Sequence, residues 1–125
     1  MPGPDSRQTT GRRGESAART ELERRGYAIL ATGFRTKCGE IDLVARDGAT
    51  LVFVEVRTRR GGRCGTAAES VTRRKQLQVA RMARAYLATE GGGDGPCRFD
   101  VVAIDYDGAC SEPRIVVYQA AFDAP

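Results

Sequence analysis

Residues 39–57, GEIDLVARDGATLVFVEVR, constrain the fold most strongly because two alternating segments flank a turn signal. Residues 40–46 and 51–58 alternate between polar and apolar side chains, which is the period of a half-buried β-strand. Asp47-Gly48 is a dipeptide typical of hairpin turns, so the stretch predicts two antiparallel strands. Regular alternation gives the first strand two faces, with Glu40, Asp42 and Val44 on one and Ile41 and Leu43 on the other.

The length of the turn decides which side chains oppose each other. A four-residue turn places Asp42 directly opposite Glu55, and a two-residue turn places Glu40 opposite Glu55. Both turns put Asp42, Glu55 and Arg57 on one face, whereas a three-residue turn separates them unless a bulge restores the register. Two of the three simplest turns therefore predict a cluster of carboxylates.

Carboxylates that face each other on a sheet repel, so another group is expected to offset the repulsion. One alternative is that Arg57 and other arginines form solvated salt bridges with the carboxylates. The other is a divalent cation, because carboxylates from neighbouring strands and a backbone carbonyl are oxygen ligands that Mg²⁺ accepts. The spacing alone leaves both alternatives open.

The length and composition of the chain predict one folded domain. Its 125 residues include 41% hydrophobic and 29% charged residues, as in a globular protein with a single core. We expect residues 1–10, rich in Pro, Gly, Ser and Thr, to form a disordered tail, and residues 11–125 to form the domain. No apolar run reaches membrane-spanning length, and the first residues lack the apolar core of a secretory signal. We therefore expect a cytoplasmic protein that has no membrane partner.

The absence of histidine limits the chemistry that this chain can perform. Histidine-based triads and imidazole acid–base catalysis are excluded, so carboxylates, Lys, Arg, Tyr, Ser, Thr, Cys or a metal would have to carry a reaction. The four cysteines form no CxxC pair, which argues against a zinc site and favours free thiols in a reducing compartment. They are Cys38, Cys64, Cys97 and Cys110.

The net charge of +4 is unevenly distributed along the chain. Residues 40–56 carry a net charge of −3, whereas residues 1–39 carry +4, residues 57–84 carry +8 and residues 85–125 carry −5. An acidic hairpin between basic segments suits a polyanion held over a cation-binding centre. The alternative is that arginine-rich helices are simply well solvated.

The rest of the chain predicts an α/β fold with a sheet of about five strands and helices packed against it. The expected order is helix 12–25, strand 27–36, the hairpin, helix 73–89, strand 98–106 and strand 114–119. Thr72 can cap the second helix, and Glu15 falls in the first turn of the first, where it would complement the helix dipole. The core-facing residues of the second helix are Val79, Met82, Ala83, Tyr86 and Leu87.

Asp42, followed by Glu55-Val56-Arg57 at the end of a hydrophobic strand, resembles the PD-(D/E)xK nuclease signature. Wider motifs are similar to the YraN family of small bacterial proteins, which are predicted to be endonuclease-like. These motifs are RGE at residues 13–15, RGY at 25–27, GEIDLV at 39–44, FVEVR at 53–57 and FDVV at 99–102. The resemblance covers residues 11–122 and extends to archaeal Holliday-junction resolvases, which implies a restriction-endonuclease-like mixed β-sheet of about five strands flanked by helices.

The resemblance also implies a role for individual residues. Asp42 and Glu55 would coordinate Mg²⁺ or Mn²⁺, with the Val56 carbonyl and Glu15 as further ligands. Lys75 and Gln76 fall where such folds place polar residues of the following helix near the site. The implied chemistry is an in-line attack of water on a phosphodiester while the cation neutralises developing negative charge.

Arg57 occupies the position where the signature has lysine. Lysine can orient or deprotonate the attacking water, whereas arginine stays protonated and can only stabilise charge. Lys75 could replace the missing lysine if the second helix leans over the hairpin.

The leading hypothesis is a Mg²⁺-dependent endonuclease that acts on DNA, on branched or repair intermediates. The alternative is a non-catalytic nucleic-acid-binding module of the same fold, and a third hypothesis is an interaction subunit unrelated to nucleic acid. Because branched junctions have two-fold symmetry, the resemblance to resolvases suggests a homodimer. The residues expected to contact nucleic acid are Arg12, Arg13, Arg59, Arg60, Arg63, Arg73, Arg74 and Gln76.

Overall fold

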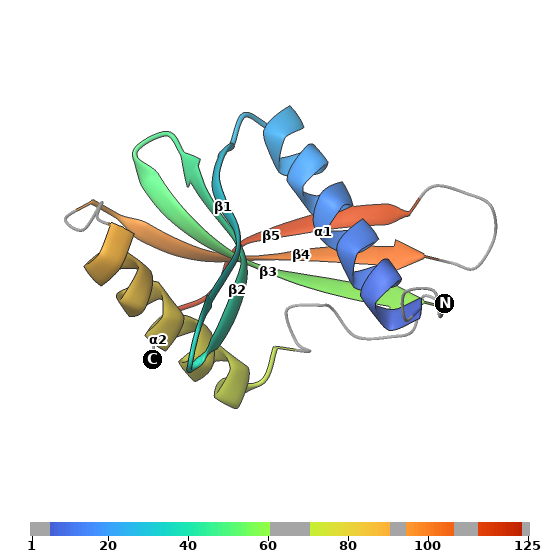
Figure 1. Ribbon diagram of the computed structural model, residues 1–125. Coiled ribbons are helices and arrows are strands. Elements are labelled where there is room, and N and C mark those ends of the chain that lie inside the picture. The colour runs from blue at the N-terminus through green and yellow to red at the C-terminus, as the bar shows by residue number, and fades with distance from the viewer. Residues whose placement is uncertain (1–5, 61–70, 91–94, 107–112, 124–125) are drawn as a thin grey trace.

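The structure, a computed structural model, describes residues 6–60, 71–90, 95–106 and 113–123, and the side chains of this set apart from residues 6–13 and Arg60. Within these residues the chain forms two helices and five strands (Figure 1). Their order is α1 (Ser6–Arg24), β1 (Ala28–Thr36), β2 (Gly39–Asp47), β3 (Thr50–Arg60), α2 (Arg73–Glu90), β4 (Cys97–Tyr106) and β5 (Arg114–Phe122). Arg63 and the other residues outside these ranges are not described.

The five strands form one mixed sheet in the order β1-β2-β3-β4-β5. Strands β3 and β4 are parallel and are connected through α2, whereas the other neighbouring pairs are antiparallel. A parallel pair needs a crossover connection, which α2 supplies. The predicted α/β fold with a five-stranded mixed sheet flanked by helices is therefore confirmed.

The β2–β3 hairpin adopts the register that places Arg46 opposite Leu51. This is the register predicted for the four-residue turn. Asp47 still pairs with Thr50, so only Gly48 and Ala49 form the turn. Gly48 has a positive φ of 61°, which suits glycine at the first central position of a hairpin turn.

The two helices pack on opposite faces of the sheet. Along β3, Leu51 and Phe53 belong to the same hydrophobic cluster as residues of α2, whereas Val52 and Val54 belong to the cluster that includes residues of α1. Because successive side chains of a strand point to opposite faces, each helix covers one face. Figure 1 shows the helices on either side of the β1–β2 ribbon.

Strand β2 separates from β3 beyond Leu43. The β2–β3 pairing ends at Leu43 and Val54, whereas the β1–β2 pairing continues to Thr36 and Gly39. The β1–β2 ribbon therefore diverges from β3, as Figure 1 shows. Asp42 lies at the point where the two strands separate, and we call this point the fork.

The expected alternation of side chains along β2 is wrong at the fork. Ile41 packs in the same hydrophobic cluster as Val44, whereas Leu43 packs in the other cluster. Regular alternation would put Ile41 with Leu43. The alternation fails because the strand twists away from β3 at this point and turns the side chain of Ile41 toward α2.

Helix α1 begins at Ser6, so the prediction that it begins at Arg12 is wrong. Once a helix is formed, each further residue adds a hydrogen bond, so the weak helix formers Thr9, Thr10 and Gly11 do not end it. The earlier start also puts Glu15 inside the helix rather than in its first turn, so the expected interaction with the helix dipole is wrong.

Helix α2 confirms the predicted cap and the predicted core stripe. The Lys75 amide donates a 3.2 Å hydrogen bond to the Thr72 hydroxyl, as at an N-cap. The predicted stripe is buried except for Leu87, which is partly buried.

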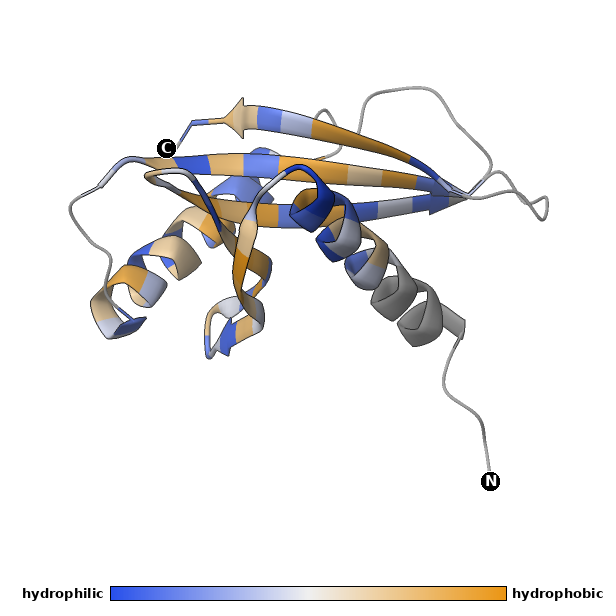
Figure 2. Cartoon of the chain, turned by 90° about the horizontal axis from the view of Figure 1, so that it is seen from above, coloured by the Kyte–Doolittle hydropathy of each residue, from blue (hydrophilic) through white to orange (hydrophobic). Residues whose placement is uncertain are grey.

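Figure 2 shows that β3 is mostly hydrophobic at its beginning and becomes hydrophilic toward its C-terminal end. Neither described helix is both long and apolar enough to cross a membrane.

The FDVV motif places Asp100, which is fully buried, in the middle of a polar network. Its carboxylate accepts hydrogen bonds from both the Nε and an Nη of Arg98, from the Tyr27 hydroxyl and from the Ala120 amide. The network connects the end of α1 to β4 and to the bulge in β5. Because the described residues already satisfy both carboxylate oxygens, we assign Asp100 a structural role.

Candidate functional site

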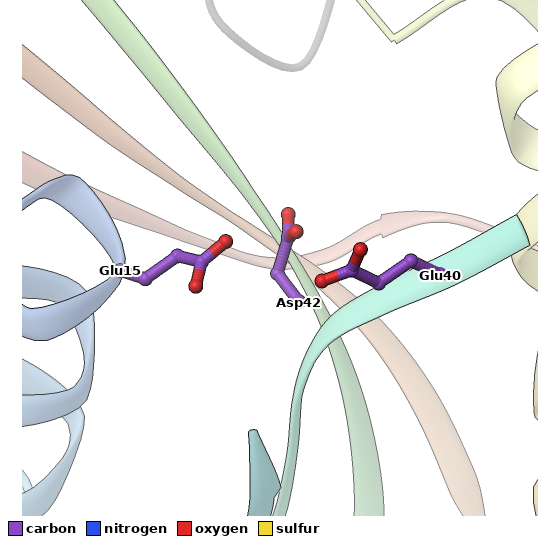
Figure 3. Close-up of side chains that lie close together, drawn as sticks. All are labelled: Glu15, Glu40 and Asp42. Carbon is purple, nitrogen blue, oxygen red and sulfur yellow. The ribbon is translucent and has the colours of Figure 1, made fainter. Parts of the chain in front are cut away.

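Three carboxylates from two elements converge at the fork (Figure 3). One oxygen each of Glu15, Glu40 and Asp42 lies within 4.8 Å of the other two. Glu15 comes from α1 and the other two come from β2. All three side chains are half-buried, so solvent screens their mutual repulsion only in part.

Gly14 allows α1 to approach the sheet at this point. A Cβ atom at Gly14 would collide with the hydroxyl of Thr58 on β3. Without that atom, the helix backbone lies against the strand and the next residue, Glu15, reaches the fork. The close approach of α1 to β3 therefore requires glycine at the middle position of the RGE segment.

Asp42 is fixed by the backbone of the neighbouring strand. The Val56 amide donates a 2.8 Å hydrogen bond to Oδ2 of Asp42. The backbone pairing of β2 with β3 ends at Leu43 and Val54, before it reaches Val56. The side chain of Asp42 therefore accepts the hydrogen bond of the Val56 amide in place of a backbone carbonyl of β2. The fork thus orients Asp42 through the same residue, Val56, whose carbonyl the family resemblance implies as a ligand.

Glu55 lies next to this group and is only 4% exposed. Nζ of Lys75 lies 3.6 Å from Oε1 of Glu55, and an Nη of Arg57 lies 3.8 Å from the same oxygen. Helix α2 therefore leans over the hairpin, which is the condition under which Lys75 could replace the signature lysine. We refer to Glu15, Glu40, Asp42 and Glu55 together as the acidic site.

Burial and like charge raise the pKa values of three of these carboxyls. Burial, followed by the charge of Asp42, raises the pKa of Glu55 to about 7, although Lys75 and Arg57 oppose this shift. Burial raises the pKa of Asp42, against the Val56 hydrogen bond and Lys75. Burial also raises the pKa of Glu15, as do the charges of Asp42 and Glu40. Burial is thus the largest cause in all three carboxyls, and the neighbouring carboxylates add to it.

The donor set fits a hard divalent cation. Carboxylate oxygens are the ligands that Mg²⁺ and Mn²⁺ prefer, and a cation would offset the repulsion that adds to burial in raising these pKa values. Glu15, Glu40 and Asp42 are close enough to share one ion, and Glu55 interacts with Asp42 beside them. Salt bridges, the other alternative, also contribute, because Lys75 and Arg57 contact Glu55 and Arg35 contacts Glu40.

Glu40 is the residue of this site to which the sequence assigns no role. Its other neighbour is Arg35 on β1, whose Nη2 lies 2.8 Å from Oε2 of Glu40. Gly33, with φ of +64°, leaves room for this carboxylate, since a Cβ there would lie 3.3 Å from Oε1 of Glu40. The signal that could have found Glu40 is its position two residues before Asp42 in a strand.

The predicted nucleic-acid contacts are spread over several elements. Arg73 and Arg74 are exposed in the first turn of α2, and Arg59 is half-buried on β3. Gln76 instead donates a 3.1 Å hydrogen bond to the Val71 carbonyl. The backbones of Arg12, Arg13 and Arg60 lie in α1 and β3 but their side chains are outside the described set, as is the whole of Arg63.

A sequence model described as "Uncharacterised protein family UPF0102" matches residues 14–104 of this chain. The chain belongs to the UPF0102 family. A UPF0102 protein of Symbiobacterium thermophilum is 50% identical over 114 residues, which cover 91% of this chain and 96% of the relative. UPF0102 proteins of Pelotomaculum thermopropionicum and Geobacter metallireducens are 42% and 48% identical, and cover 94% and 93% of this chain and 98% and 93% of their own lengths. The stretch that matches the UPF0102 model contains the whole acidic site and Lys75.

Proposed function

We propose that this UPF0102 protein is a divalent-cation-dependent endonuclease that hydrolyses DNA phosphodiesters, with branched or repair intermediates as its substrates. The observation that carries the proposal is the convergence of Glu15, Glu40 and Asp42 within 4.8 Å at the fork. Raised pKa values for Glu15 and Asp42 agree with it, because burial, with a contribution from neighbouring carboxylates, makes the ionised forms costly unless a cation binds them. The resemblance of the hairpin to the PD-(D/E)xK signature agrees with this function.

Glu15 and Asp42 would hold Mg²⁺ or Mn²⁺, together with Glu40, Glu55 or the Val56 carbonyl. When bound, the ion would neutralise charge that develops on the phosphate and lower the pKa of a water molecule. Asp42 is already oriented by the Val56 amide, so its oxygen needs little rearrangement to bind a ligand.

Lys75 is the residue best suited to position water at this site. Lys75 belongs to α2, and its amine lies 3.6 Å from the Glu55 carboxylate. A lysine amine can orient water or exchange a proton. Arg57 lies 3.8 Å from the same carboxylate but stays protonated, so it can stabilise charge on the phosphate without accepting a proton. We therefore assign the role of the signature lysine to Lys75.

The test is a cleavage assay on linear, flapped and four-way DNA with Mg²⁺ or Mn²⁺. Purified Asp42→Asn and Glu55→Gln proteins should lose cleavage and retain DNA binding, whereas Glu23→Gln, which changes an exposed carboxylate on α1, should cleave normally. Glu40→Gln reports whether the third carboxylate is needed for cleavage. Equal cleavage by all of these proteins would point to a contaminating nuclease and overturn the proposal.

One observation favours a second candidate function, a non-catalytic DNA-binding module. The arginine at the signature position contacts the buried Glu55, so a guanidinium already neutralises part of the charge that a cation would neutralise. This candidate predicts salt-sensitive DNA binding without cleavage under any divalent cation. It also predicts that Asp42→Asn retains this DNA binding.

A further inference from the structure

A groove of about 530 Å³ lies outside the acidic site, between the first half of α2 and the turn that joins β1 to β2. Its lining residues on α2 are Arg74, Leu77, Gln78 and Arg81, and Cys38 lines it from the turn. The spacing of the four α2 residues places them on one face of the helix. Figure 1 shows the start of α2 beside this turn, in agreement with the contacts between α2 and both strands.

The groove is strongly cationic. Arg74 and Arg81 are exposed, and neither forms an ion pair with a carboxylate within the part of the chain that the structure describes. Among the described residues that line the groove none is acidic, and the first turn of α2 contains no acidic residue either. The amide groups at the start of the helix add positive potential, so the groove favours an anion along its length.

The walls of the groove are held in place from both sides. Nε2 of Gln78 donates a 3.0 Å hydrogen bond to the Cys38 carbonyl. Gly39, which follows, has a φ of +144°, and a Cβ there would collide with the amide of Gln78. A ligand therefore meets a preformed surface and loses little free energy in ordering it.

The segments that line the groove also supply residues at or beside the acidic site. Lys75, which contacts Glu55, is the neighbour of Arg74 on α2. On the opposite wall, Cys38 lies two residues before Glu40 in the chain. The groove and the fork therefore lie on neighbouring residues of the same segments.

We propose that this groove binds the phosphate backbone of DNA on one side of the phosphodiester that is cut. The choice of DNA rests on the proposed function, and the choice of its backbone rests on the cationic lining. Arg74 and Arg81 lie about 10.5 Å apart along the helix axis, which is about the rise of three base pairs in B-DNA. The two guanidiniums can therefore contact phosphates of the same stretch of one strand, and Leu77 between them faces the sugars.

The first experiment measures DNA binding of the full chain by fluorescence anisotropy at several salt concentrations, in the Asp42→Asn background and with EDTA. The Arg74→Ala/Arg81→Ala protein should bind roughly tenfold more weakly than the background protein, and its salt slope should fall by about two. The matched control is Arg24→Ala/Arg114→Ala, which removes two exposed arginines outside the groove. This control should retain both the affinity and the slope.

The second experiment locates the DNA through alkylation of cysteine by N-ethylmaleimide, followed by peptide mass spectrometry. Cys38 and Cys97 are both exposed thiols, but only Cys38 lines the groove. Saturating DNA should abolish alkylation of Cys38 and leave that of Cys97 unchanged. Equal alkylation of Cys38 with and without DNA would contradict the proposal.

The outcomes separate the groove from the nuclease. If the wild-type protein cleaves DNA but the groove and control variants bind with equal affinity and slope, the groove proposal is overturned and the proposed function stands. If binding depends on Arg74 and Arg81 but no cation supports cleavage, the groove proposal stands and the nuclease proposal is overturned. If no variant binds DNA, both are overturned.

Discussion

Glu55 carries the least exposed carboxyl of the acidic site, and its pKa of about 7 makes stability depend on pH. The folded protein holds this proton above the ordinary pKa of 4.5, so the stabilisation is complete below pH 4.5 and is lost as the pH rises through 7. We expect the wild-type protein in EDTA to lose stability between pH 5 and pH 8. Glu55→Gln should therefore be more stable than wild type at pH 8, by up to about 3 kcal/mol.

Urea unfolding at pH 5, 6, 7 and 8 measures this difference. Glu23→Gln, an exposed site, is the control and should follow the wild-type curve. Addition of Mg²⁺ at pH 8 should restore stability to the wild-type protein and less to Glu55→Gln, because a cation binds the ionised carboxylate. Parallel pH curves for wild type and Glu55→Gln would contradict the raised pKa.

Lys75 and Arg57 contact the same oxygen of Glu55 but are expected to contribute differently to cleavage. Lys75→Met should reduce the cleavage rate by about 10²- to 10⁴-fold while DNA binding is retained, because the amine that positions water is lost. Arg57→Lys should retain cleavage. Single-turnover rates across pH measure both, and the opposite ranking of the two variants would assign the lysine role to residue 57.

Contact between two elements, α1 and β3, holds Glu15 at the fork. Gly14→Ala introduces a Cβ that collides with the Thr58 hydroxyl, so we expect a loss of about 1–3 kcal/mol in unfolding free energy and weaker Mn²⁺ binding as Glu15 moves away. Thr58→Ala removes the colliding oxygen, so the double variant should recover much of both. Ser16→Ala, at an exposed neighbour on α1, is the control. Chemical denaturation and calorimetric Mn²⁺ titration provide the two measurements.

Some elements follow directly from the sequence because local periods determine them. The alternation of residues 40–46 and 51–58 and the turn at Gly48 predict the hairpin, and the spacing of apolar residues predicts the buried face of α2. The register was predicted only as one of several alternatives, because turns of two or four residues both keep the carboxylates on one face. The observed pairing of Asp47 with Thr50 selects between them.

Other features depend on packing between distant segments and cannot be read from local patterns. The approach of Lys75 to Glu55 depends on how α2 packs against the sheet. The position of Glu40 beside Glu15 depends on how α1 packs against the sheet, which no pattern within β2 determines. The start of α1 at Ser6 runs against the weak helix propensity of the residues that follow it.

On the scale of the whole molecule, the acidic site lies beside the most basic part of the chain. Residues 57–84, with a net charge of +8, include the end of β3 and most of α2, and they contribute both Lys75 and the cationic groove. Phosphates are thus attracted to the surface around a centre that repels them. A cation at the acidic site would remove that repulsion, so DNA binding and cation binding should reinforce each other.

This coupling predicts that Ca²⁺, a hard cation with the same oxygen ligands, tightens DNA binding by the wild-type protein, by roughly tenfold at low salt. Glu15→Gln/Asp42→Asn should bind DNA in EDTA about as tightly as the wild-type protein does with Ca²⁺, because the repulsion has been removed by mutation. Glu23→Gln/Asp123→Asn removes two exposed carboxylates elsewhere and should keep the full response to Ca²⁺. Anisotropy titrations with and without Ca²⁺ measure the coupling, and an equal response in all three proteins would place the cation outside the acidic site.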